Sequence, residues 1–225
     1  MGRYLSAAVT QFPSAIAPDQ DPAALAQWLA ERAGKLTASR MKDAISFLKN
    51  GNPSQKRSDY MRDLLAERAT GLSTRHFVTP AMLFGLEQPP VAKAAFEEAT
   101  GIKLIDSGFY DHPMIDMFGA TPDYEIANEG LVEIKVPNSS TFVEWVLDPS
   151  VMLDEHRPQC LAQLACTGRK WVDLAAFDPR IKDQGRRLFV RRIEPTRDEI
   201  TKIEEQAERF LKEVDQMWEQ FTAAS

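Results

Sequence analysis

The sequence predicts a mixed α/β fold, in which helices flank a central sheet, a helical layer lies at the N-terminus and a long helix ends the chain. Three observations support this class. Residues 21–100 have helical spacing with glycine stops, residues 103–193 have strand-like runs interrupted by one helix, and residues 196–221 have one continuous amphipathic period. We expect residues 1–20 to form a surface arm and residues 21–225 to form a single domain with a buried core.

The N-terminal layer is expected to consist of helices. The first begins at Asp21-Pro22, a favourable pair for a cap and first turn, and ends before Gly34. The other helices are expected over residues 37–48, 58–69, 79–86 and 90–100, with a polar loop over residues 52–57.

Strand character follows Gly101 and continues to the last helix. We expect strands over residues 103–110, 114–120, 131–136, 170–177 and 186–193, and a helix over residues 155–167. Thr196 and Glu199 fit a capping box, and the apolar residues from Ile200 to Phe221 then keep helical spacing. The last helix should therefore pack its apolar face on the body and turn its acids to water.

The composition is that of a globular protein, with 44% hydrophobic and 27% charged residues. No run approaches 18 apolar residues, so no membrane span is expected. Cys160 and Cys166 lie almost two helical turns apart, too far for a disulfide, which favours two buried thiols in the reducing cytoplasm.

Charge is unevenly distributed along the chain, whose net charge is −6. Residues 157–192 carry nine Lys or Arg and three Asp, whereas residues 196–219 carry eight acids and four bases. The basic stretch is a candidate for sequence-independent contact with a DNA backbone. Its charges are equally compatible with a solvated face or a contact with a neighbouring subunit.

The residues that carry chemistry lie around one predicted strand. Side chains alternate across a strand, so Glu133 and Lys135 share one face and Ile134 points to the other. Opposite charges inside an apolar strand are costly unless they serve a site. Asp123 precedes this strand by a short connection.

Phosphodiester hydrolysis explains this choice of residue types. The carboxylates of Asp123 and Glu133 are hard oxygen ligands for Mg²⁺, with Mn²⁺ as a substitute, and the backbone carbonyl of Ile134 can complete the coordination. A bound metal lowers the pKa of water and polarises a phosphoryl oxygen. Lys135 can orient that water and stabilise developing negative charge. The pattern alone is weak, because it also occurs in a surface strand with an ion pair across one face.

Five segments in order, from about Trp28 to Arg192, resemble the phage lambda exonuclease family of viral recombination (alkaline) exonucleases, within the PD-(D/E)XK nuclease superfamily. These segments are Arg32-Ala-Gly-Lys-Leu-Thr37-Ala-Ser39, Thr79-Pro-Ala-Met-Leu-Phe-Gly85-Leu-Glu87, Pro122-Asp123 with Glu133-Ile134-Lys135, His156-Arg-Pro-Gln159 and Phe177-Asp-Pro-Arg180.

The resemblance implies a PD-(D/E)XK core and a Mg²⁺-dependent 5′-to-3′ exonuclease. Such an enzyme resects one strand of duplex DNA from a 5′-phosphorylated end and leaves a 3′ single strand for a phage-encoded annealing protein. It also implies a ring-shaped homotrimer that works in the cytoplasm of a bacterial host. Arg32 and Ser39, with Thr37, match the positions that hold the 5′-phosphate. Gln159 matches a helix glutamine that reaches the active site.

The chain departs from the family pattern at three points. Pro89 stands where a second glutamate is usual, so Glu87 either replaces that acid or the site works with fewer acids. His156 replaces a tyrosine, which puts a DNA-backbone contact in doubt, and Tyr124 follows Asp123 where glycine is common.

Two other functions remain open from the sequence. The same core serves endonucleases, although a 5′-phosphate pocket at Arg32 favours an enzyme that acts on ends. The change at Pro89 is also compatible with a DNA-end-binding protein of impaired catalysis, although the presence of Asp123, Glu133 and Lys135 together argues against it.

Overall fold

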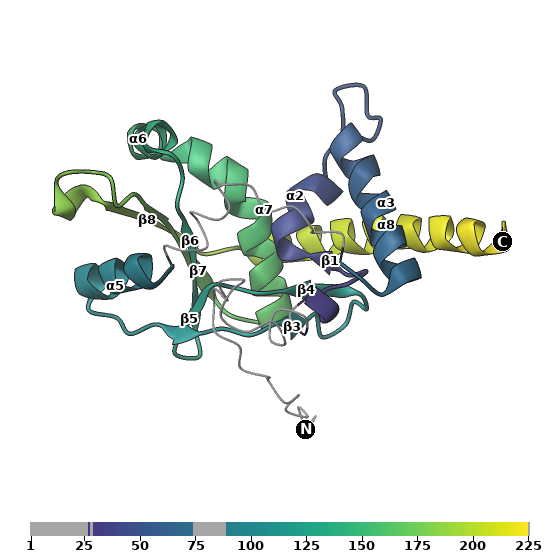
Figure 1. Cartoon of the computed structure of the whole chain (residues 1–225), viewed down its shortest axis with the longest axis horizontal. Helices are drawn as coiled ribbons and strands as arrows, with labels where there is room; N and C mark the ends of the chain where they lie inside the picture. The colour runs from purple at the N-terminus through teal and green to yellow at the C-terminus, as the bar shows by residue number, and fades with distance from the viewer. Residues whose placement is uncertain (1–26, 28, 74–88, 225) are drawn as a thin grey trace.

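The computed structural model describes residue 27, residues 29–73 and residues 89–224 (Figure 1). The predicted arm, most of the first predicted helix, the predicted helix over residues 79–86 and Glu87 lie outside the described residues.

A five-stranded sheet with the order β2-β5-β6-β7-β8 forms the centre of the fold. Its strands are β2 (Ile105–Asp106), β5 (Tyr124–Ile126), β6 (Gly130–Lys135), β7 (Trp171–Phe177) and β8 (Leu188–Ile193). Within this sheet β6 and β7 pair in parallel, and the chain between them forms helices α6 (Ser139–Leu147) and α7 (Pro149–Thr167). The other neighbours in the sheet are antiparallel. A parallel pair joined by a helical crossover confirms the α/β class.

A second sheet brings the N-terminal segment to the centre of the molecule. Its order is β1-β4-β3, formed by β1 (Leu36–Thr37), β4 (Phe118–Ala120) and β3 (Tyr110–Asp111). β1 pairs in parallel with β4, the strand that precedes Asp123. Gly119 on β4 has no room for a side chain, because an added Cβ would lie 2.2 Å from the ring of Phe109.

Helices cover both faces of the central sheet, and a helical layer lies beside it (Figure 1). The remaining helices are η1 (Ala38–Arg40), α2 (Met41–Ala44), α3 (Gln55–Thr70), α5 (Pro89–Thr100), η2 (Gln184–Arg186) and α8 (Arg197–Ala223). One apolar core lies between the sheet and α6 and α7, and a second lies between the opposite face and α5. A third joins α2, α3, α7 and α8 to the small sheet.

The long C-terminal helix begins as predicted. The Thr196 hydroxyl accepts a hydrogen bond from the Glu199 amide at 3.3 Å, and the Glu199 carboxylate accepts one from the Thr196 amide at 2.9 Å. This is the reciprocal capping box expected from the sequence. Cys160 and Cys166 are buried free thiols, also as expected.

Several predicted elements were wrong in extent. The helix expected over residues 37–48 is reduced to η1 and α2, because the chain turns back at Ile45 and Phe47 bridges to Pro53. α3 begins earlier than expected, since the Ser54 hydroxyl accepts a hydrogen bond from the Arg57 amide and caps it. The strands expected over residues 103–110 and 114–120 are much shorter.

Three elements were missed or truncated in the prediction. α7 begins at Pro149 rather than residue 155, with Asp148 as its cap. α6 is capped by Asn138, whose side chain accepts a hydrogen bond from the Thr141 amide. The short strand β5, Tyr124–Ile126, was not predicted. Within the described part of the chain, no helix has the length and apolar character to cross a membrane.

Candidate active site at the end of β6

The site begins where two antiparallel strands separate. β5 pairs with β6 as far as Tyr124 opposite Val132. Beyond this pair, the side chain of Asp123 rather than its backbone contacts β6. The Asp123 Oδ2 atom accepts a hydrogen bond from the Ile134 amide at 2.7 Å. In an antiparallel strand the amide and carbonyl of one residue face the same side, so the Ile134 carbonyl also faces the Asp123 side.

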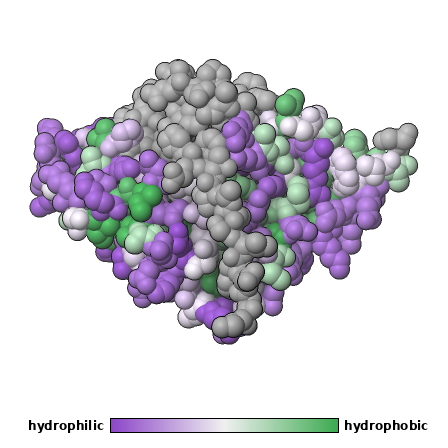
Figure 2. Space-filling model, turned by 90° about the horizontal axis from the view of Figure 1, so that it is seen from below, coloured by the Kyte–Doolittle hydropathy of each residue, from purple (hydrophilic) through white to green (hydrophobic). Residues whose placement is uncertain are grey.

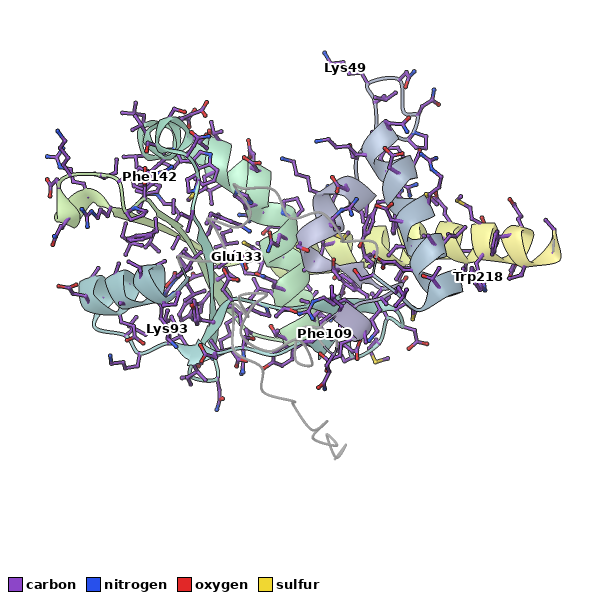
Figure 3. The ribbon with its side chains drawn as sticks, in the orientation of Figure 1. Lys49, Lys93, Phe109, Glu133, Phe142 and Trp218 are labelled. Atoms are coloured by element: carbon purple, nitrogen blue, oxygen red, sulfur yellow. The ribbon has the colours of Figure 1, made fainter. Side chains whose placement is uncertain are left out.

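Strand alternation then directs the charged side chains of β6 toward α7. Leu131 packs in the core beneath α6 and α7, and Glu133 and Lys135 follow it on the same face. Val132 and Ile134 pack on the opposite face with α5. The prediction that Glu133 and Lys135 share a face is confirmed, and Figure 3 shows Glu133 in the region between β6 and α7.

Two glutamines one turn apart on α7 reach the Glu133 carboxylate. Its Oε1 atom accepts hydrogen bonds from Lys135 Nζ and Gln159 Nε2, both at 2.6 Å. Its Oε2 atom accepts one from Gln163 Nε2 at 2.6 Å. Lys135 Nζ also donates to Gln159 Oε1 at 3.0 Å. The result is a buried polar network, because Glu133 is 3% exposed and Gln163 is 0% exposed.

The charges in this network shift its titration. Burial, together with the negative charge of Glu133, raises the pKa of Asp123 to about 7, against the opposing effects of Lys135 and the Ile134 amide. Burial alone would lower the pKa of Lys135, but the charges of Glu133 and Asp123 outweigh it and the pKa lies above its ordinary value. Lys135 therefore stays cationic at neutral pH, while Asp123 binds a proton more readily than an exposed aspartate does.

This donor set suits a divalent cation. Burial and, after it, the negative charge of Glu133 raise the pKa of Asp123, and a cation bound beside the two carboxylates would offset that charge. Carboxylate and carbonyl oxygens are the ligands that hard cations prefer. Over residues 29–73 and 89–224, no group of three or more His, Cys, Asp or Glu side chains is placed to hold a metal, so the described part of this site offers two acids and a backbone carbonyl. Glu87, the predicted further acid, lies outside the described residues.

His156 lies one turn before Gln159 on α7. Its ring packs edge-on against Trp145, with centroids 5.2 Å apart and an interplanar angle of 86°. Burial and the positive charges of Lys135 and Lys42 lower the pKa of His156 to about 3. The imidazole of His156 is therefore neutral at physiological pH.

The small sheet brings the predicted phosphate-binding segment toward Asp123. The Arg32 guanidinium donates a hydrogen bond to the Thr121 hydroxyl, two residues before Asp123, and lies 4.9 Å from the centre of the Phe109 ring. The Thr37 and Ser39 hydroxyls are 3.3 Å apart. Thr37 precedes η1 but forms no side-chain cap there, so capping does not account for its hydroxyl in the described structure.

The basic stretch over residues 157–192 is largely taken up by ion pairs. Its paired residues are Arg157 with Glu199, Arg169 with Glu125, Lys170 with Glu129, Arg180 with Asp178, Arg186 with Asp183 and Arg192 with Asp173. Arg180 also donates to the Pro137 carbonyl and so fixes the turn after β7 to the chain beyond Lys135. The local positive excess therefore has a structural explanation at most of these positions.

The sequence prediction did not find two residues of this region. Gln163 is four residues after Gln159, a spacing that puts both on one helical face, and this was the available signal. Thr121 lies beside the predicted Pro122-Asp123 pair, but its contact with Arg32 depends on the pairing of β1 with β4.

Comparison with known proteins gives the following similarities. The model of the YqaJ-like viral recombinase domain matches residues 27–170. The crystal structure of an alkaline exonuclease, LHK-Exo from Laribacter hongkongensis, is 34% identical with a TM-score of 0.77, and the match covers 88% of this chain and 96% of that one. The same enzyme in complex with dAMP gives the same values.

A phage-related exonuclease from Haemophilus somnus 129PT matches at a TM-score of 0.71, over 83% of this chain and 96% of its own. Its identity is 12%, so this likeness concerns the fold alone. No significant match is found among curated proteins.

Proposed function

Because the chain belongs to the family of YqaJ-like viral recombinase domains and is a nuclease that hydrolyses DNA phosphodiester bonds, we propose that it is a magnesium-dependent 5′-to-3′ exonuclease. Its substrate is a 5′-phosphorylated end of duplex DNA, and its product is a 3′ single strand. The observation that carries the proposal is the convergence of Asp123, Glu133, Lys135 and Gln159 at the end of β6.

Each residue of the site has a role that follows from its chemistry. Asp123 and Glu133, with the Ile134 carbonyl, would hold the cation, which when bound supplies an acidified water and an electrophile for the phosphoryl oxygen. Lys135 remains charged and stabilises the negative charge that develops on the phosphate. The Gln159 amide, already within hydrogen-bonding distance of Lys135, offers a donor to phosphate or water.

Recognition of the DNA end is assigned to the N-terminal segment. The Arg32 guanidinium is suited to bidentate binding of a terminal phosphate, and the Thr37 and Ser39 hydroxyls add donors nearby in the chain. The Arg32 contact with Thr121 supports this role, because it links the segment to the chain that leads into Asp123.

The wider setting is proposed from the family. We infer that residues 21–225 work as one domain, that the chain assembles as a ring-shaped trimer, and that a phage or prophage encodes it together with a single-strand annealing protein. Its place of action would be the cytoplasm of the bacterial host.

The decisive experiment compares three DNA substrates in Mg²⁺: linear duplex with 5′-phosphate, linear duplex with 5′-hydroxyl, and covalently closed circles. We expect mononucleotide release from the first, slower release from the second, and none from the third. Labelling each strand end separately then gives the polarity. Cleavage of the closed circle would identify an endonuclease, and end binding without nucleotide release would identify an impaired enzyme.

A further inference from the structure

Gln163 is an unusual residue for its position on α7. The helix around it is apolar and buried, with Cys160 at 0% and Leu164 at 2% exposure, and Gln163 itself is fully buried. Its Nε2 atom has one acceptor, Glu133 Oε2, whereas its Oε1 atom has no hydrogen-bond partner among the described residues. A buried carbonyl without a donor is unfavourable, so packing alone does not explain an amide here.

The amide can have only one orientation toward Glu133. With the opposite orientation the Gln163 carbonyl would face a carboxylate, and two acceptors would repel each other. The donated hydrogen bond therefore fixes Oε2 on the inner side of the site. The terminal torsion of a glutamate is soft, so a carboxylate without such a contact can turn.

The donors to the two carboxylate oxygens of Glu133 differ in how easily they can move to other partners. Oε1 is held by Lys135 and Gln159, and the Lys135 side chain is 23% exposed and shared between two acceptors. The Lys135 ammonium and the Gln159 amide are both proposed to contact the substrate, and in doing so they would give up their hydrogen bonds to Glu133. Gln163 has no access to solvent and stays on Oε2.

We propose that Gln163 is a positioning residue that fixes the Glu133 carboxylate by Oε2 and so presents Oε1 to the divalent cation. This inference rests on the proposed function, because it assumes that Glu133 is a metal ligand. Groups that orient ligating carboxylates typically contribute about 10-fold to 100-fold to metal affinity or activity.

The test measures Mn²⁺ binding by calorimetry on the DNA-free protein. Gln163→Met keeps the approximate volume and removes the donor, and we expect its Mn²⁺ affinity to fall by about 10-fold to 100-fold. Its affinity for DNA ends without metal should equal that of the wild type. Leu164→Met, a similar substitution at the next buried position of the helix, is the matched control and should leave Mn²⁺ affinity unchanged.

Three results would separate the possible failures. If the wild-type protein binds no Mn²⁺, the proposed metal site itself is wrong. If the wild type binds Mn²⁺ and Gln163→Met binds it equally well, only the role of Gln163 is overturned. Should the Met variant not fold, by circular dichroism, Gln163→Asn replaces it, since its amide is too short for the same contact; wild-type Mn²⁺ affinity in that variant would also overturn the inference.

Discussion

At the scale of single residues, a substitution of Lys135 is expected to affect DNA hydrolysis but not DNA-end binding. Its ammonium group touches both Glu133 and Gln159 but is not itself an oxygen ligand. We expect Lys135→Ala to abolish hydrolysis, because the charge that stabilises the transition state is removed. DNA-end binding, measured by fluorescence anisotropy, should remain largely intact. A variant that hydrolyses DNA near the wild-type rate would remove Lys135 from the mechanism.

Arg32 provides a second test at this scale. Arg32→Ala should erase the preference for 5′-phosphorylated over 5′-hydroxyl ends, since the guanidinium is the proposed phosphate ligand. Lys35→Ala is the matched control, because Lys35 lies over the same Phe109 ring at 4.8 Å but pairs with Asp111. The ratio of initial rates on the two substrates is the measurement. An unchanged ratio in Arg32→Ala would place the phosphate pocket elsewhere.

The raised pKa of Asp123 predicts a pH-dependent stability of the metal-free protein. The folded-state pKa of about 7 lies above the ordinary value of 3.8, so the folded protein keeps a proton that the unfolded chain releases. The resulting stability is fully present below the unfolded pKa and is lost as pH rises through the folded pKa. A tenfold change in such an equilibrium corresponds to about 1.4 kcal/mol.

We therefore expect metal-free wild-type protein to lose stability, on the order of a few kcal/mol, between pH 4 and pH 8 relative to Asp123→Asn, which cannot titrate. Urea unfolding in EDTA across this range is the measurement. Parallel pH profiles for the two proteins would contradict the assigned shift.

Residue patterns predicted part of this site and not the rest. Strand alternation was enough to put Glu133 and Lys135 on one face, because that geometry is local. The pairing of Glu133 with Gln163 joins β6 to α7 across a crossover, and nothing local to either segment specifies it. Arg32 reaches Thr121 only because two short strands, far apart in sequence, pair in parallel.

At the scale of elements, α8 offers a test that is separate from catalysis. Thr196→Ala removes the capping hydroxyl and should lower the free energy of unfolding by about 1 kcal/mol, while the exonuclease rate stays unchanged. Urea denaturation measures the loss. Thr222→Ala, which removes a hydroxyl bonded within the last turn of the same helix, should have a smaller effect. Equal losses in the two variants would show that the cap does not set the stability of α8.

Elements were predictable where a local signal was complete. The capping box and the long amphipathic period gave α8 its true start. The same kind of signal, Asp148 before Pro149, marks the start of α7, but the prediction began this helix only at residue 155. β5 has three residues and is defined mainly by its partners β2 and β6, so the sequence alone did not reveal it.

At the scale of the whole molecule, a buried arginine forms one of the ion pairs that join α3 to α8. Arg57 on α3 is 1% exposed and donates two hydrogen bonds to Glu213 on α8, at 2.8 and 3.0 Å. The guanidinium also lies against the Phe210 ring. Because the cation is buried and its partner is not, loss of the partner leaves a charge that water cannot reach easily.

We expect Glu213→Ala to lower the free energy of unfolding by about 2–3 kcal/mol, as for the loss of hydrogen bonds to a charged group. Asp215→Ala is the control, since it breaks a surface pair with Arg68 in which the aspartate side chain is 61% exposed, and should cost at most about 1 kcal/mol. Chemical denaturation of both variants is the measurement. An equally small loss of unfolding free energy in both variants would show that water can reach the Arg57 guanidinium when Glu213 is removed.

On the side of the molecule that Figure 2 shows, the described surface is mainly polar. In the view of Figure 2, hydrophilic residues dominate the described surface and hydrophobic ones form small groups. Ion pairs involve six of the nine Lys and Arg residues in 157–192, which reduces the free positive charge of that stretch. Composition alone could not predict this, because it depends on which acids approach which bases.

The hydrogen bond from the Ile134 amide to Asp123 has a consequence for the design of inactive variants. This carboxylate accepts the last hydrogen bond between β6 and the chain before β5, so Asp123→Ala would leave the Ile134 amide without that acceptor. Asp123→Asn keeps a carbonyl oxygen for that amide and removes only the negative charge. A comparison of the two variants would separate the stability lost with the backbone hydrogen bond from the metal affinity lost with the negative charge. The asparagine variant is the better choice for trapping an intact DNA end.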